Sequence, residues 1–504
     1  MQVYNTTITR KRLYNFLYIT VLLSGLALRI YQQFFAGRPL WEDEAHLALN
    51  FIDSGYLEMF MPLKHFQSAP ILFLLGVETC SYLFGFGEIA LRTFPFIISI
   101  LSYPLLYFFV RDMTGSRLTA LLVFIFFSFN AFVIVFASEL KPYTVEASAV
   151  IVLGYLNFSK HTYISARREK LLKITGAIAL FAANTSFIML FVIACYRFLY
   201  LRQVKQYASG EEYQKTRLFN KRLFTTWGIA FAASIILNII INPYADNMRE
   251  VWKSQFIPMN IFSSEFLQFM QQHLHDIFFR YVLLLTDMQL AAYLLAALLL
   301  TGIVYMLRVK HYDWLLIVVL PVMIHLFLSW AQLYPLYERF ILYLVPLMYI
   351  WMAISIVTVA NVLTNKIHAF AAGVWIMAML VFVLQTSMYK YPVIGRDVKP
   401  CLDVINRYPA NMKLYVTAPK TLYEYYLKTG YVHNTTNEEV LSGLSIEQYN
   451  EQVGYRPDGY IMLYVATKDD AAAHLIRHLE SQSLIRYKYE YGSYGVVIVQ
   501  PRLN

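Results

Sequence analysis

The sequence is poor in charged residues and in cysteine. Only 15% of its 504 residues are Asp, Glu, Lys or Arg, whereas soluble domains carry about 25%. Its three cysteines, Cys80, Cys195 and Cys401, are too few and too scattered for a disulfide framework or a thiolate zinc site. It also has no internal repeat and no low-complexity segment. These absences exclude a disulfide-stabilised protein and argue against a soluble one.

The chain is instead rich in apolar residues, at 58% of the total. Repeated apolar runs of roughly 17–25 residues are long enough to cross a bilayer as helices. The sequence therefore predicts an α-helical polytopic membrane protein. We expect eleven spans, at residues 14–33, 92–110, 118–138, 143–158, 173–184, 186–201, 224–241, 280–305, 314–331, 340–360 and 369–388.

The fifth and sixth spans are short, and we interpret them as a hairpin that turns at residues 184–186. Basic segments flank this stretch on both sides, which favours two spans. The alternative is one long tilted span, and it would reverse the orientation of everything downstream.

Lys and Arg residues occupy alternate loops, beginning with Arg10, Lys11 and Arg12, and such loops stay cytoplasmic. The other loops are poor in cations, and the first of them, residues 34–91, is acidic. Within it, residues 69–88 are apolar but short, so we expect an amphipathic or interfacial helix rather than a span. No small-residue cleavage site follows the first apolar run, so we expect that run to remain as an anchor.

The composition changes after residue 389. We predict a membrane bundle over residues 1–389, including the loop 34–91, and a small α/β domain over residues 390–504 on the extracytoplasmic side. Its expected elements are the strands "MKLYVTA" and "YIMLYVA", the helices "PKTLYEYYLKTG" and "DAAAHLIRHLESQ", and a terminal hairpin in "RYKYEYGSYGVVIVQP".

Three adjacent carboxylates, Glu42, Asp43 and Glu44, follow the first span. A carboxylate next to the membrane is costly to desolvate, so it suggests a functional site. Mutual repulsion should raise the pKa of at least one of the three. The structural alternative is a solvated acidic turn.

Further polar groups fall in the same set of loops. Glu139 and Lys141 end the third span, where Pro142 biases Lys141 away from helical geometry. Arg339, near Tyr337, enters the tenth span, and its guanidinium suits a phosphate. The structural alternatives are an interfacial ion pair and an arginine that reaches toward lipid headgroups.

Two weaker candidates complete the set. Lys64, His65 and Gln67 precede the apolar helix of the first loop, where a plain polar loop is the alternative. His273 and His275 form a His-x-His pair, which can bind a metal but lacks defined partners.

All these groups are predicted on one side of the membrane. A carboxylate can take a proton from a hydroxyl, and cations can stabilise the charge on a leaving phosphate. The lipid phase could deliver a long-chain phosphate carrier. The residues together indicate transfer from a lipid-linked donor outside the cytoplasm.

The order of several motifs resembles the glycosyltransferase-C superfamily. These motifs are the Asp43-Glu44 pair, the Gln-Ser-Ala-Pro element at 67–70, "FGFGEIALRTFPF", Glu-x-Lys-Pro-Tyr at 139–143 and "YPLYERFILYLVP". The most similar branch contains bacterial relatives of protein O-mannosyltransferases and lipid A aminoarabinose transferases. The resemblance covers roughly residues 10–390, and the C-terminal domain resembles the small outer domain of such proteins only loosely.

The resemblance implies roles for individual residues. Asp43 matches the catalytic carboxylate, with Glu44 as its neighbour, and Arg339 matches a residue facing the donor phosphate. Substrate-binding positions are implied for Glu139, Lys141, Lys64, His65, Gln67 and Tyr337. Some relatives have His-Lys-Pro-Pro where this chain has Gln-Ser-Ala-Pro, so the cation of that motif is missing here or is supplied by Lys64.

We therefore expect a glycosyltransferase of the plasma (inner) membrane, with its active site on the extracytoplasmic side. It would move a monosaccharide from a polyprenyl-phosphate donor to a hydroxyl of a lipid, polysaccharide or protein acceptor, with inversion. We expect contact with membrane lipids and no nucleic-acid partner. The sequence defines no cofactor and does not decide whether a divalent metal is bound.

The alternative functions are a transporter or lipid flippase, which would keep ionisable residues near the bilayer midplane, and an oligosaccharide polymerase or ligase that uses a diphosphate-linked donor.

Overall fold

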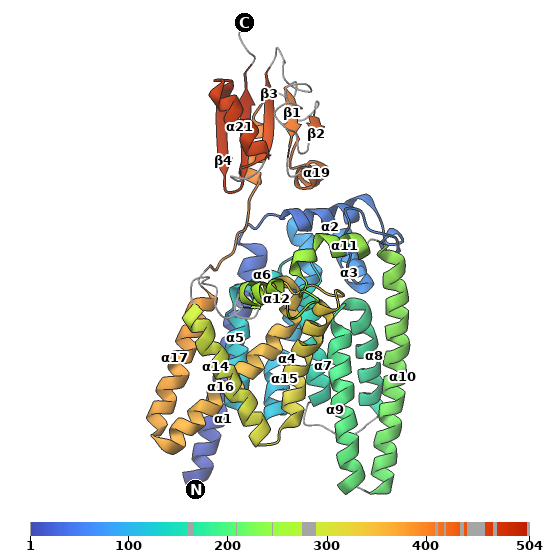
Figure 1. Ribbon diagram of the computed structural model, residues 1–504, viewed down its shortest axis with the longest axis vertical. Helices are drawn as coiled ribbons and strands as arrows, with labels where there is room; N and C mark the ends of the chain where they lie inside the picture. Colours follow the sequence, from blue (N-terminus) through green and yellow to red (C-terminus); the bar gives the residue numbers. More distant parts are fainter. Residues whose placement is uncertain are drawn as a thin grey trace. The chain divides into compact units, whose positions relative to one another are not determined.

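The chain is described by a computed structural model and forms two compact units (Figure 1). The first unit contains Met1–Gln33, Met59–Val77 and Arg92–Pro392, and the second contains Phe34–Glu58, Glu78–Leu91 and Val393–Asn504. The structure describes residues 2–158, 166–207, 209–243, 245–274, 289–388, 390–408, 412–417, 420–433, 438–440, 459–466 and 471–500.

The described part of the first unit contains helices joined by loops and has no strand. Its longer helices are α1 (Gln2–Phe34), α4 (Glu88–Thr114), α5 (Arg117–Ser128), α7 (Tyr143–Phe158), α8 (Ala166–Ala182), α9 (Ser186–Tyr207), α10 (Gly210–Ile241), α14 (Gln289–Arg308), α15 (Tyr312–Trp330), α16 (Val345–Lys366) and α17 (Ala369–Ser387). Short helices are η1 (Glu58–Phe60), α3 (Ile71–Phe84), α6 (Ala131–Ala137), α11 (Ala245–Val251), η2 (Lys253–Gln255), α12 (Ser264–Phe269), η3 (Met270–Leu274) and η4 (Glu338–Leu344). The last residue of α1, the C-terminal part of α3 and the first turn of α4 are assigned to the second unit.

The predicted polytopic membrane architecture is confirmed. Among the described residues, eight helices are long and apolar enough to cross a bilayer, or nine if the bent pair α5–α6 is one span. The count of eleven stays a prediction, because α7 has only 16 residues and α8 only 17, while a span needs about 20. The short helix predicted in the first loop is also present, as α3, and its 14 residues are too few to span.

The predicted hairpin at residues 184–186 is confirmed. Helix α8 ends at Ala182 and α9 begins at Ser186, and the two helices contact each other. The Ser186 hydroxyl donates to the Ala179 carbonyl at 2.9 Å, which satisfies one of the acceptors freed where α8 ends. The alternative of one long span across this stretch is wrong.

The third predicted span, 118–138, is broken rather than continuous. Helices α5 and α6 meet at an angle of 66°. Asn130 caps α6, because its Oδ1 accepts a hydrogen bond from the Val133 N–H at 3.0 Å. The fully buried Arg29 of α1 donates to the Ser128 carbonyl at 3.3 Å and the Phe127 carbonyl at 3.1 Å. One guanidinium therefore donates to two carbonyl groups that have no helical hydrogen-bond donor, because α5 ends there.

Replacing Arg29 with methionine is expected to destabilise the first unit. Methionine fills similar space but leaves the Phe127 and Ser128 carbonyls without their donor, and each buried unpaired group costs about 1–3 kcal/mol. The variant should show a lower thermal midpoint and a lower yield of monodisperse protein. A higher midpoint would mean that burying the charge costs more than its hydrogen bonds contribute.

The second unit contains a five-stranded sheet with strand order β2-β1-β3-β5-β4. The strands are β1 (Lys413–Val416), β2 (Glu438–Val440), β3 (Tyr460–Val465), β4 (Ile485–Tyr491) and β5 (Tyr494–Val499). Strand β1 pairs in parallel with β2 and β3, whereas β5 pairs antiparallel with β3 and β4. Helices α18 (Lys399–Asn406), α19 (Lys420–Lys428) and α21 (Ala471–Ser481) complete this α/β part. The predicted strands, helices and hairpin are present, and β2 and α18 are additions.

Two segments of the first loop belong to the second unit and not to the bundle. One is helix α2 (Glu42–Asp53), which packs against α19. The other contains Glu88, whose carboxylate lies 2.7 Å from Lys399 Nζ. Hydrogen bonds from Tyr425 to the Phe86 carbonyl, at 2.9 Å, and from Tyr426 to Glu88 join the same parts. The acidic helix α2 is thus held by α19, which lies more than 300 positions away in sequence.

Candidate functional site

The three adjacent carboxylates form the first turn of α2. A helix N-terminus carries a partial positive charge, so carboxylates are stabilised there. Glu44 is fully buried, and its Oε2 accepts from the Trp41 N–H at 3.4 Å and lies 3.9 Å from Arg38 Nη2. These contacts give Glu44 a part in starting the helix. Asp43 is half-buried, and the catalytic roles of Asp43 and Glu44 stay predictions.

The prediction that at least one of the three carboxyl groups has a raised pKa is met at Glu42. Desolvation, and then the charge of Asp43, raise the pKa of the Glu42 carboxyl, while Arg396 partly opposes the rise. The fold therefore disfavours the ionised form of Glu42.

In the first unit, the structure brings Lys141 and Gln67 together across 74 positions of sequence. Lys141 Nζ donates to Gln67 Oε1 at 2.7 Å, and both side chains are buried. The backbone N–H of Lys141 donates to the Glu139 carbonyl at 2.7 Å, which makes a tight turn between α6 and α7. As Pro142 predicted, Lys141 is not helical. The fold therefore presents a buried ammonium group outside the helices, next to the buried Glu139.

The loop that supplies Gln67 has an unusual backbone. His65 and Phe66 have φ values of +58° and +52°, and such left-handed residues cost of order 1–3 kcal/mol each. The Gln67 amide Nε2 donates to the His65 carbonyl at 3.3 Å, which aims Oε1 at Lys141. Lys64 is exposed on the same turn. Strain of this kind persists where the surroundings impose it, and it often marks functional sites.

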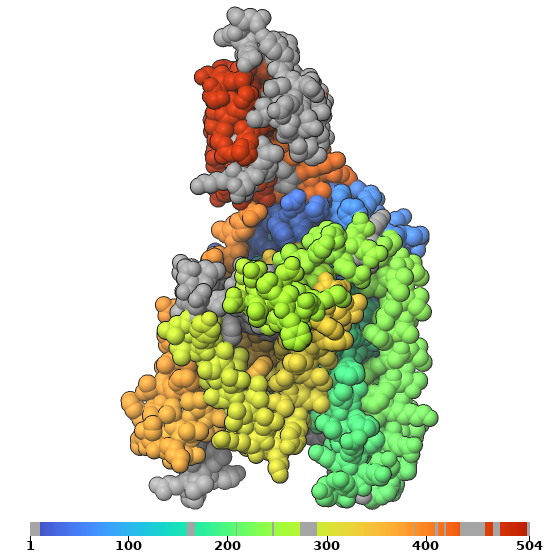
Figure 2. Space-filling view, in the orientation of Figure 1, coloured from blue at the N-terminus to red at the C-terminus, as the bar shows by residue number. Residues whose placement is uncertain are grey.

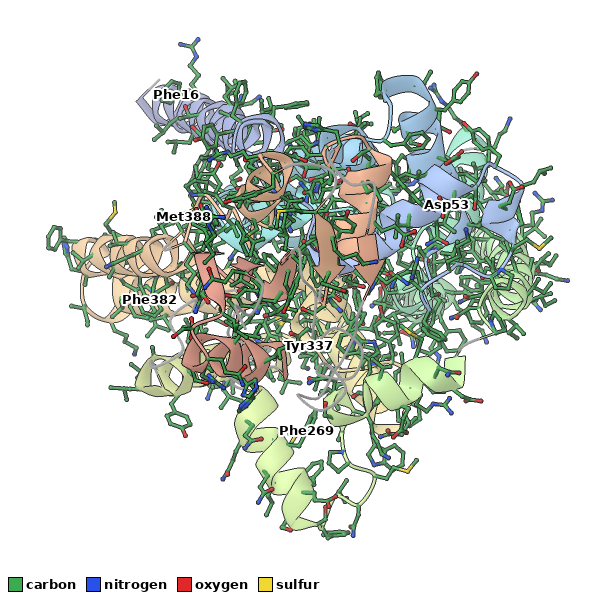
Figure 3. All side chains as sticks on the ribbon, turned by 90° about the horizontal axis from the view of Figure 1, so that it is seen from above. Phe16, Asp53, Phe269, Tyr337, Phe382 and Met388 are labelled. Atoms are coloured by element: carbon green, nitrogen blue, oxygen red, sulfur yellow. The ribbon has the colours of Figure 1, made fainter. Side chains whose placement is uncertain are left out.

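Arg339 lies among aromatic rings in η4. Its guanidinium carbon is 4.9 Å from the ring centroid of Trp252, 5.6 Å from Phe340, 5.8 Å from Tyr337 and 6.0 Å from Tyr143. Tyr337 is labelled in Figure 3. Cation–π contacts favour the charged form and hold its orientation. Arg339 is therefore confined by aromatic rings from separate segments. The alternative of a side chain that reaches freely toward lipid headgroups does not describe it.

Tyr143 is near Lys141 in sequence and near Arg339 in space. It follows Lys141 by two residues, and its ring faces Arg339, because α7 packs against η4. The sequence marks Tyr143 only as the last residue of the Glu-x-Lys-Pro-Tyr element and does not mark Trp252. Aromatic residues are frequent in this chain, so nothing in the local pattern distinguishes Trp252.

The candidate residues divide between the units. Glu139, Lys141, Lys64, His65, Gln67, Arg339 and Tyr337 belong to the first unit, and Asp43 and Glu44 belong to the second. Among the described residues, no group of three or more His, Cys, Asp and Glu side chains could hold a metal ion. The side chains of the predicted His-x-His pair, His273 and His275, lie outside the described part of the chain.

Reversing the charge of Asp53 is expected to loosen α2. Asp53, labelled in Figure 3, ends α2, and its Oδ1 lies 2.6 Å from Lys428 Nζ of α19. The pair is partly exposed, so it contributes about 1 kcal/mol or less. Asp53→Lys should speed amide hydrogen exchange over residues 42–53 by about threefold to tenfold, measured by mass spectrometry.

The double variant Asp53→Lys with Lys428→Asp tests whether this pair is responsible. Restored protection in the double variant would confirm the coupling, as in any double-mutant cycle. Exchange in α2 that is unchanged in Asp53→Lys would show that apolar packing alone holds α2 on α19.

Comparison with solved structures identifies the fold. The crystal structure of ArnT from Cupriavidus metallidurans bound to undecaprenyl phosphate matches with a TM-score of 0.52 at 10% identity, covering 95% of this chain and 98% of that one. ArnT from the same organism in the apo state matches with a TM-score of 0.50 at 11% identity, covering 94% and 97%. No protein-family model matches the sequence, and no curated protein matches it. At such identities the likeness shows the fold alone.

Proposed function

Because the chain has the glycosyltransferase-C fold of ArnT, we propose that it is an integral membrane glycosyltransferase that uses a lipid-linked sugar donor. The main support for the proposal is the buried ammonium of Lys141, which Gln67 holds, together with the contact of Tyr143, two residues later, with Arg339. Two oriented cations in a multi-pass membrane protein suit the phosphate of a lipid carrier. The undecaprenyl phosphate bound to ArnT supports a polyprenyl-phosphate donor.

The proposed reaction is a direct displacement. The acceptor hydroxyl oxygen attacks the anomeric carbon of the sugar while Asp43 takes the hydroxyl proton. The bond from that carbon to the phosphate oxygen breaks, and the lipid phosphate leaves with the electron pair. Lys141 and Arg339 neutralise the charge that develops on the phosphate. One displacement inverts the configuration at the anomeric carbon.

The remaining candidates have supporting roles in this proposal. Gln67 orients Lys141, and Glu139, Lys64, His65 and Tyr337 line the substrate region. The acceptor is a lipid, polysaccharide or protein hydroxyl. The distribution of Lys and Arg supports a plasma-membrane protein whose active site faces away from the cytoplasm.

A transfer assay tests the donor class. The intact protein in proteoliposomes is given radiolabelled sugars on polyprenyl monophosphate or polyprenyl diphosphate, with a membrane extract as acceptor. We expect transfer from monophosphate donors only. Transfer from diphosphate donors alone would favour the polymerase or ligase alternative. Substrate uptake without transfer would favour a transporter.

A further inference from the structure

A cavity of about 420 Å³ lies in the first unit, and its lining contains none of the residues proposed for transfer. It is formed by the turn between α8 and α9, by α10, and by the end of α15 with the segment that follows. Its volume falls within the usual range for small-molecule sites, about 300–1,000 Å³. Its lining residues are Leu180, Asn184, Thr185, Phe187, Ile188, Phe231, Ser234, Ile235, Asn238, Leu328, Leu333 and Tyr334.

The polar lining of this cavity is neutral. It consists of two amides, two aliphatic hydroxyls and one phenol, from Asn184, Asn238, Thr185, Ser234 and Tyr334. No Lys, Arg, Asp or Glu is among the lining residues that the structure describes. A phosphate would lack a cation here, whereas the hydroxyl groups of an uncharged sugar could both donate to and accept from such groups.

Thr185 gives the cavity a deeply buried hydroxyl group. The residue is 1% exposed, and its hydroxyl lies beside the Glu146 carboxyl, which also faces the backbone N–H groups of Asn184 and Thr185. A hydroxyl that donates to a carboxylate can still accept a hydrogen bond, so Thr185 can accept one from a sugar hydroxyl. The Ser234 hydroxyl donates to the Phe231 carbonyl at 2.9 Å and can accept in the same way.

The cavity also has apolar walls and an apolar edge. The rings of Phe187 and Phe231 face it with their centroids 5.7 Å apart. Phe231, Ile235 and Leu333 are exposed at its edge. Helix α10, drawn in green in Figures 1 and 2, is a candidate membrane span of which only 17% of the apolar window is buried. A ligand with hydrocarbon chains could therefore enter sideways from the lipid phase.

We propose that this cavity binds the headgroup of a neutral glycolipid. The sugar hydroxyls bond to Thr185, Asn184 and Asn238, one face of the sugar lies against the phenylalanine rings, and the hydrocarbon chains run along α10. The site does not depend on the proposed transferase function, because its test measures binding and needs no turnover.

Photocrosslinking of the full chain tests this site. The protein is placed in phosphatidylcholine nanodiscs with a monoglucosyl diacylglycerol that carries a diazirine beside the sugar. Labelled peptides are identified by mass spectrometry, and unlabelled glucosyl diacylglycerol or phosphatidic acid is added as competitor. We expect labelling of residues 180–188 and 231–238, lost on addition of the glucolipid but not of phosphatidic acid.

Two variants test the polar contacts. Thr185→Val keeps the shape of the side chain, and Asn238→Leu changes an exposed residue, so folding should survive at least in the second. Each should weaken binding about fivefold, the effect of losing one typical hydrogen bond. Thr226→Val is the matched control, because its hydroxyl donates to the Arg222 carbonyl at 2.9 Å away from the cavity.

The proposal is wrong if phosphatidic acid competes as well as the glucolipid, since the site would then select for phosphate or for acyl chains. It is equally wrong if labelling falls outside these segments. Unchanged binding in both Thr185→Val and Asn238→Leu would also overturn it.

Discussion

Replacing Asp43 with asparagine is expected to reduce sugar transfer by about 10²–10⁴-fold, the usual contribution of a general base. Asparagine has nearly the same size and is accepted at the start of a helix, so α2 should still form. The measurement is the initial rate of transfer from a polyprenyl-monophosphate donor in proteoliposomes, alongside the thermal midpoint and the elution profile of each variant.

Glu42→Gln is the matched control for this substitution. It removes a carboxylate from the same helical turn, next to Asp43 in sequence. We expect it to retain most of the activity. If a folded Asp43→Asn protein transfers sugar at a rate close to that of the unchanged protein, Asp43 is not the general base. The role that the family resemblance implies for Asp43 would then be wrong.

Replacing Lys141 with methionine is expected to lower kcat by about 10²–10³-fold. The ammonium would stabilise the phosphate as negative charge develops on it, and one such contact typically contributes this much. Gln67→Leu keeps the ammonium but removes the acceptor that orients it at 2.7 Å, so its effect should be smaller, about tenfold. Both rates are measured at saturating donor, so that kcat and KM are separated.

Lys253→Met is the control for the loss of a lysine. Lys253 is exposed and pairs with Glu250 at 3.1 Å, and such surface pairs contribute little. Its activity should match that of the unchanged protein. If Lys141→Met lowers folded yield and transfer by the same factor, the buried lysine serves the fold and not the reaction.

The properties that sequence predicted well are local ones. Hydropathy over some 20 residues reports whether a helix can lie in a bilayer, so the membrane class needed no tertiary information. The turn at residues 184–186 could be predicted because basic segments flank the stretch on both sides. They place both of its ends on the same side of the membrane, which requires two spans. Alternating and continuous apolar runs likewise indicated β1, β3, α19 and the β4–β5 hairpin.

The predictions that failed or were absent concern packing between distant segments. The span 118–138 looked continuous, and its break at Asn130 depends on Arg29 from another helix. No local feature associates α2 with α19, which lies more than 300 residues later.

The candidate site shows the same division. Three adjacent carboxylates, a Glu-x-Lys-Pro segment and an arginine among tyrosines are visible in the chain, so the candidate residue types could be predicted without a structure. The contact of Gln67 with Lys141, and those of Trp252 and Tyr143 with Arg339, became known only from the folded chain. A hydrogen bond or a cation–π contact depends on distance in space, and residues 74 or more positions apart meet only when the helices between them have packed.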